Sequence, residues 1–189
     1  MPPTPHDTRL RTRPLLVRAQ TIDAQNRSVE GVIATEEPVA VWDWESRGVI
    51  DEVLLLGGVE LPEQIPLLRD HDQYNLDAVL GSARSLRREE TGILARLFFA
   101  REDPEADRAW NKVKQGHLRD LSVGYWVDES TDVPAGQTAT VAGREFRAEK
   151  RLLRIATRWS LRETSLVVIG ADQAAKLETV VNKTKESTP

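Results

Sequence analysis

Short apolar runs, separated by polar and glycine-containing breaks, dominate the first hundred residues of the chain. The runs are rich in branched and aromatic side chains, and residues such as Gly, Asn, Asp and Pro stand between them, a pattern typical of β-strands. The predicted strands cover residues 15–22, 28–34, 38–44, 65–68, 79–87 and 93–100. The last two are expected to form a hairpin with its turn at residues 89–92. The apolar run 49–56 fits either a strand or a short helix, because periodicity does not separate the two.

One segment has the period of an amphipathic helix. Residues 104–115 carry apolar side chains at i, i+3, i+4 and i+7, namely Ala106, Ala109, Trp110 and Val113. Asp103 is a suitable N-cap and Pro104 suits the first helical position, while Gly116 suits the end. We therefore predict a helix over residues 104–115.

Two further β-like segments follow this helix. Successive side chains of a strand project to opposite faces of the sheet. Over residues 118–127 this places Leu121, Val123, Tyr125 and Val127 on one face, and Ser122, Gly124 and Trp126 on the other. Residues 152–169 predict two strands broken near Arg162, and residues 171–181 predict a short helix.

Many short strands with one clear helix indicate an α+β fold that is mainly β. We expect a β-barrel, or a strongly bent sheet, with helices packed outside it. The domain is expected to span residues 15–181, with an exposed excursion at 128–150. A proline-rich arm at 1–14 and a tail at 182–189 are predicted to be flexible.

Composition restricts the classes of function. The 189 residues include no cysteine, which excludes disulfides and thiolate catalysis, and they contain no apolar run long enough for a membrane span. A net charge of −4 argues against a nucleic-acid partner. The basic cluster 144–154 is interrupted by Glu145 and Glu149 and is interpreted as a solvated hairpin.

A serine, a histidine and a carboxylate in three separate segments suggest a hydrolase with an activated hydroxyl. Ser122 lies on a predicted strand, with Gly124 leaving room for a substrate carbonyl. His71 has the proton affinity of a general base at neutral pH, and Glu163 can fix its tautomer. The same residues also fit a fold without catalysis. In that case Ser122 is a strand serine, His71 a loop histidine and Glu163 an edge-strand glutamate.

Other assignments remain open from the residues alone. His117 lies close to Ser122 in sequence and is an alternative third member, while Asp72 and Asp120 are alternative acids. A metal site at Asp70, His71 and Asp72 is disfavoured, because adjacent side chains rarely converge on one ion. We predict neither a metal nor another cofactor. Trp126 shares the face of Ser122 and is a candidate for the border of a substrate pocket, and Arg158 or Arg162 is a candidate to assist a developing oxyanion through water.

The sequence around these residues resembles that of the tailed-phage prohead proteases, also called head maturation proteases. Five segments match in order over about residues 28–175: IPLLRDHD, VLGSARSL, TGILARLFF, VKQGHLRDLSVGYWV and WSLRETSLVVIGADQAA. One departure is that Val168–Asp172 lacks the proline common in the family before alanine-aspartate.

The resemblance implies a herpesvirus-assemblin-like antiparallel β-barrel and a serine endopeptidase with Ser122 as nucleophile, His71 as base and, less directly, Glu163 as the third member. It further implies that the substrates are scaffold and major-capsid-protein segments and the protease itself, as a homo-oligomer inside an immature prohead in the host cytoplasm. A non-enzymatic scaffold or assembly protein of the same fold is the alternative, and an unrelated β-barrel binding module is a second one.

Overall fold

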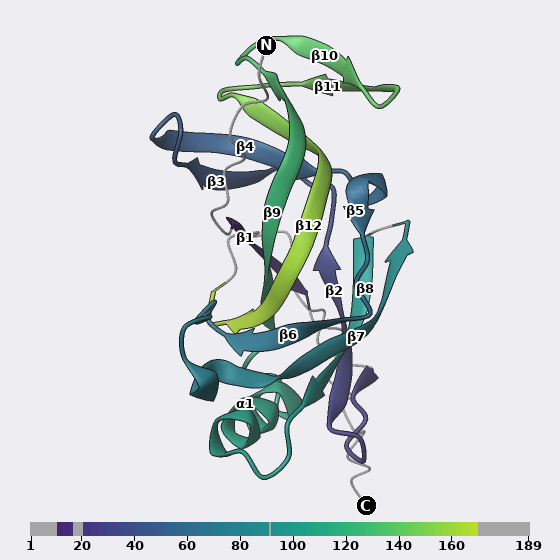
Figure 1. Cartoon of the computed structure of the whole chain (residues 1–189), viewed down its shortest axis with the longest axis vertical. Coiled ribbons are helices and arrows are strands. Elements are labelled where there is room, and N and C mark those ends of the chain that lie inside the picture. Colours follow the sequence, from purple (N-terminus) through teal and green to yellow (C-terminus); the bar gives the residue numbers. More distant parts are fainter. Residues whose placement is uncertain (1–10, 17–20, 91, 170–189) are drawn as a thin grey trace, which may run out of the picture.

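The computed structural model describes residues 11–16, 21–90 and 92–169, and it is mainly β (Figure 1). The strands are β1 (Arg11–Leu16), β2 (Ser28–Ala34), β3 (Val39–Asp43), β4 (Gly48–Leu54), β5 (Val59–Glu60), β6 (Gln64–Arg69), β7 (Val79–Glu89), β8 (Gly92–Phe99), β9 (Asp120–Val133), β10 (Thr138–Val141), β11 (Arg144–Arg147) and β12 (Leu153–Val167). The predicted α+β, mainly β class is confirmed.

Ten of these strands form one curled sheet, with the order β1-β9-β12-β6-β7-β8-β2 and with β3, β4 and β5 attached beside it. The expected antiparallel barrel is wrong in two respects. No ladder joins the edge strands β1 and β2 among the described residues, so the sheet is not closed. In addition, β12 pairs in parallel with β4, β5 and β6, whereas its pairing with β9 is antiparallel.

Two long strands, β9 and β12, run side by side through the molecule (Figure 1). The predicted break of residues 152–169 into two strands is wrong, because β12 is continuous. Its register against β9 shifts at three places, one of which lies between Leu161 and Glu163. Strand β1 begins at Arg11, inside the segment predicted to be an arm, and pairs with β9.

The predicted helix is confirmed as α1 (Pro104–Lys114), whose apolar stripe is buried. Asp103 caps it by accepting a hydrogen bond from the Ala106 N–H at 2.7 Å. Where a few surrounding helices were expected, the described residues contain this single α-helix and the 3-10 turns Leu56–Gly58 and Leu76–Ala78. No helix in this described part is long and apolar enough to cross a bilayer.

The main core fills the inside of the curled sheet. Leu121, Val123 and Tyr125 of β9 face it, as the alternation predicted, and Trp159 of β12 packs against Tyr125 there. A smaller core lies under the β10–β11 hairpin, which forms the upper end of the molecule in Figure 1 and falls within the predicted excursion 128–150. The predicted helix 171–181 and the tail 182–189 lie outside the described residues.

Candidate active site

The site begins at a tight turn that ends β6. Asp70 and His71 have φ angles of 51° and 60°, and the Asp72 N–H donates to the Arg69 carbonyl at 3.0 Å. Two successive positive φ angles across such a hydrogen bond are the pattern of a type I′ turn, and Asp and His are among the few non-glycine residues that enter this region. The turn directs the chain back over β12, because the Asp70 N–H donates to the Leu166 carbonyl at 3.0 Å.

His71 is held by two residues of β12 that lie two positions apart. Its ring Nδ1 lies 2.7 Å from Glu163 Oε1, and its backbone N–H donates to Ser165 Oγ at 3.1 Å. The Ser165 hydroxyl donates in turn to Glu163 Oε2 at 2.6 Å. Glu163 and Ser165 are buried, whereas the His71 side chain is 21% exposed. A carboxylate on Nδ1 selects the tautomer in which Nε2 is free to accept a proton.

Ser122 lies on the neighbouring strand, directly opposite Ser165 in the β9–β12 register. Side chains of directly paired residues project from the same face, so Ser122 shares the face of Ser165 and Glu163. Gly124 stands opposite Glu163 and adds no side chain there. The Ser122 side chain forms no hydrogen bond to His71 or to another described residue, and the residue is 4% exposed.

A β-bulge explains how Glu163 reaches this face. Leu161 pairs with Tyr125 and points into the core, yet Glu163 pairs with Gly124, so Arg162 has no residue opposite it. In a regular strand Leu161 and Glu163 would share one face, and the extra residue of a bulge changes the side on which the following residues project.

The other candidates lie apart from this pair. His117 is exposed after the end of α1, where its backbone N–H donates to the Lys112 carbonyl at 2.9 Å. Asp72 lies 4.0 Å from the Arg69 guanidinium. Across the described ranges, no three His, Asp or Glu side chains are grouped so as to hold a metal ion.

Sequence reasoning did not single out Ser165. A usable signal was present, because residues two apart on a strand share a face, and this places Ser165 beside Glu163. The hydroxyl of Ser165 both donates and accepts, and it is fully buried. It is thereby distinguished from Ser122, which faces it from β9.

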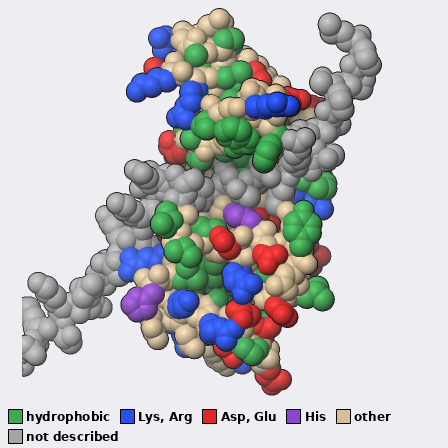
Figure 2. All heavy atoms as spheres, turned by 90° about the vertical axis from the view of Figure 1, so that its left-hand side faces the viewer, with side chains coloured by type: hydrophobic (Ala, Val, Ile, Leu, Met, Phe, Trp, Pro, Cys, Tyr) green, Lys and Arg blue, Asp and Glu red, His purple; other side chains and the backbone are tan. Residues whose placement is uncertain are grey.

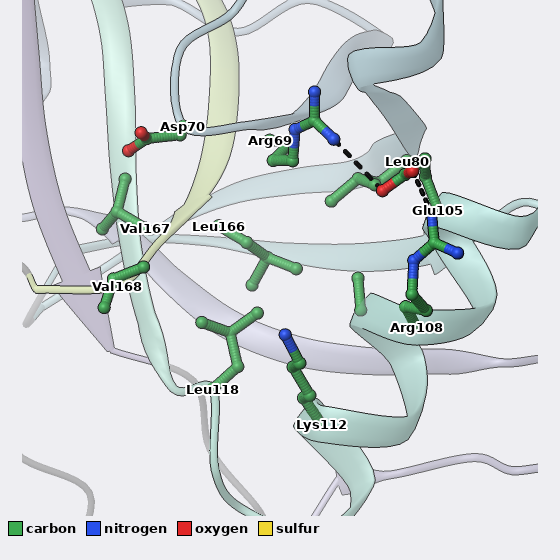
Figure 3. Close-up of a pocket in the computed structure, with 11 residues that line it drawn as sticks. Arg69, Asp70, Leu80, Glu105, Arg108, Lys112, Leu118, Leu166, Val167 and Val168 are labelled. Carbon is green, nitrogen blue, oxygen red and sulfur yellow. Dashed lines mark hydrogen bonds and ion pairs between the residues drawn. The ribbon is translucent and has the colours of Figure 1, made fainter.

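A groove of about 290 Å³ opens near the turn, but on another side of the sheet (Figure 3). Leu166 lines it and alternates along β12 with Ser165, so the groove belongs to the core face, against α1. Arg69 and Arg108 both contact Glu105 at its rim, whereas Lys112 extends from α1 into the opening. The groove is therefore separate from the face that carries Ser122.

Charged side chains of both signs lie on the described surface near these elements. In the lower half of Figure 2, acidic and basic side chains are interspersed. Many of these charges are paired, as in the contacts of Arg69 with Glu105 and Arg27 with Asp107.

A comparison with protein families found a match to the model described as caudovirus prohead serine protease, over residues 24–188. Comparisons with curated proteins and with solved structures found no match.

Proposed function

Because the chain belongs to the caudovirus prohead serine protease family, we propose that Ser122 is its nucleophile, His71 its general base and Glu163 the acid that orients the base. The family makes it a serine protease of phage prohead maturation. The observation that carries the residue assignment is the 2.7 Å contact between His71 Nδ1 and Glu163 Oε1 on the face of Ser122.

The proposed reaction is acyl transfer. Ser122 Oγ attacks the carbonyl carbon of a peptide bond while His71 Nε2 takes the hydroxyl proton. Glu163 stabilises the imidazolium that forms. His71 then protonates the leaving amine, and the C–N bond breaks. Water next attacks the acyl carbon while His71 takes its proton, and His71 returns that proton to Ser122 Oγ as the acyl group leaves. In this proposal Ser122 Oγ and His71 Nε2 form their hydrogen bond when substrate binds, because catalytic contacts are often long before that step.

The proposed substrates are scaffold and capsid-protein segments and the chain itself, cleaved inside the prohead by an assembled homo-oligomer. Strand β9 presents Ser122 between Leu121 and Val123, which are buried in the core. A nucleophile on such a strand has a fixed position, which suits the cleavage of a flexible polypeptide segment brought to it.

The test is co-expression with the major capsid protein, for wild type and for Ser122→Ala, followed by intact-mass measurement. The small, buried serine side chain makes no hydrogen bond to a described residue, so its loss should leave the fold intact while cleavage falls by a factor of about 10³ or more. Ser130→Ala, at an exposed position near the end of β9, is the matched control and should cleave normally.

Continued cleavage by the Ser122→Ala protein would remove Ser122 from the mechanism. A fluorophosphonate probe gives an independent reading, because an activated serine is labelled and a scaffold protein is not. Labelling that survives Ser122→Ala but disappears in Ser165→Ala would transfer the nucleophile to Ser165.

A further inference from the structure

The bulge in β12 places a second side chain on the catalytic face. Arg162 is the extra residue, and it is exposed, with its guanidinium 4.1 Å from the centroid of the Trp126 ring. Trp126 belongs to β9, on the same face as Ser122 and Gly124. One irregularity therefore directs Glu163 toward His71 and Arg162 over Trp126.

The guanidinium of Arg162 presents a hydrogen-bonding edge that no described residue occupies. It makes no ion pair or hydrogen bond with another described residue, whereas Arg158 on the same strand pairs with Glu129 at 2.8 Å. The acids nearest in register are already engaged, since Glu163 contacts His71 and Asp128 accepts a hydrogen bond from Ser160 at 2.8 Å. A guanidinium stacked on a ring keeps its planar N–H fork available for a carboxylate.

The face between Ser122 and this pair can accept an extended chain. Ser122, Gly124 and Trp126 alternate along β9, and the glycine leaves the space between the other two without a side chain. Farther along the same two strands, Asp128 and Ser160 line a separate hollow of about 410 Å³ together with Gly57 and Gly58. Four residues of strand place Trp126 about 13 Å from Ser122, the length of about four residues of extended peptide.

Trp126 offers a donor of its own. Its indole Nε1 is buried and has no hydrogen-bond partner among the described residues. A buried donor without a partner is uncommon, because its desolvation is not compensated. A carbonyl oxygen of a bound peptide becomes that partner once the atoms that cover Nε1 move aside on binding.

We propose that Arg162 and Trp126 form a substrate subsite that selects Asp or Glu three to four residues from the cleaved bond. The inference rests on the proposed role of Ser122, since that residue fixes where the cleaved bond lies. Arg162 binds the carboxylate, and the Trp126 ring holds the guanidinium in place while its Nε1 binds the peptide backbone.

The experiment compares cleavage of a peptide library by wild type, Arg162→Gln and Arg162→Glu, with sites identified by mass spectrometry. We expect wild type to enrich Asp and Glu at the predicted distance, Arg162→Gln to lose that enrichment, and Arg162→Glu to favour Lys or Arg. For one acidic peptide, Arg162→Gln should raise KM about tenfold with little change in kcat. Arg144→Gln is the matched control, because Arg144 is also exposed and stacked on an aromatic ring, Phe146.

Two results overturn the subsite. An unchanged cleavage profile in Arg162→Gln removes its selective role, and an equal loss of kcat on acidic and neutral peptides assigns Arg162 to the reaction itself. A binding measurement distinguishes failure of the subsite from failure of the proposed function. Titration of the Ser122→Ala protein with a Glu-containing peptide and its Gln counterpart should show tighter binding of the former, and equal affinity overturns the subsite even if no protein cleaves.

Discussion

At the scale of single residues, the arrangement of Ser165 shows how the base and the acid are fixed relative to one another. One hydroxyl accepts from the backbone of His71 and donates to the carboxylate of Glu163. Both oxygens of that carboxylate are therefore bound, one by the His71 ring and the other by Ser165. We interpret Ser165 as a positioning residue for the proposed pair.

Loss of this hydroxyl should affect turnover more than substrate affinity. We expect Ser165→Ala to lower kcat about tenfold at unchanged KM, because Glu163 and His71 lose a common partner, and to cost about 1–3 kcal/mol of stability through unsatisfied buried groups. Steady-state kinetics and chemical denaturation measure the two effects.

Glu163→Gln and His117→Ala serve as the comparison for this variant. Glu163→Gln should lower kcat further than Ser165→Ala does, and the exposed His117→Ala should cleave normally. A larger loss in His117→Ala than in Glu163→Gln would assign the third role to His117.

At the scale of elements, the start of helix α1 follows from local sequence. Asp103 and Pro104 precede an apolar stripe, and Glu105 and Asp107 lie in the first turn with Lys112 and Lys114 in the last, as the helix dipole favours. The helix packs against β7 and β8, where Trp110 contacts Phe99 with ring centroids 5.1 Å apart.

The N-cap can be tested without touching the site. Asp103→Ala should lower the free energy of unfolding by about 1 kcal/mol, because the Ala106 N–H loses its acceptor, while kcat is retained. Asp103→Asn keeps an acceptor and is the control in urea denaturation. Equal stability of the two variants would show that the cap contributes nothing measurable.

At the scale of the whole molecule, β12 joins parts of the chain that are distant in sequence, and a charged network fixes its first half. Arg154 donates to Asp43 of β3 and to Asp132 of β9, each at 2.8 Å. Burial raises the pKa of Asp43, but hydrogen bonds from Ser46 and Arg154 outweigh this and lower it to about 2. The hydrogen bond with Asp132 raises the pKa of Arg154 despite its burial, so that it stays charged.

This network predicts an acid-sensitive component of stability. A carboxyl whose pKa falls from 3.8 in the unfolded chain to about 2 in the fold stabilises the protein above pH 4, and the contribution disappears as the pH falls through 2. The shift corresponds to about 2–3 kcal/mol. Asp43→Asn should lack this component, so its stability should fall less than that of wild type between pH 4 and pH 2.

Urea denaturation at both pH values measures the difference, with the exposed Asp77→Asn as control. Parallel loss of stability in wild type and Asp43→Asn would contradict the coupling.

The amino-acid sequence was enough to predict those features that depend on neighbouring residues. It predicted the α+β class, the capped helix and the two faces of β9, because periodicity and capping act within a few residues. His71 and Glu163 were also chosen from sequence, by residue type and by the resemblance of their segments to a known family. The structure brings these two side chains together.

The way in which those pieces meet depends on contacts between segments that are far apart in the chain. His71 and Glu163 lie 92 positions apart, and their contact depends on the I′ turn after β6, on the parallel pairing of β6 with β12 and on the bulge at Arg162. Contacts between distant segments also determine the open sheet, the continuity of β12 and the pairing of β1 with β9. Register between distant strands is set by hydrogen bonds and core packing across the whole sheet, and a shift of one residue moves a side chain to the opposite face.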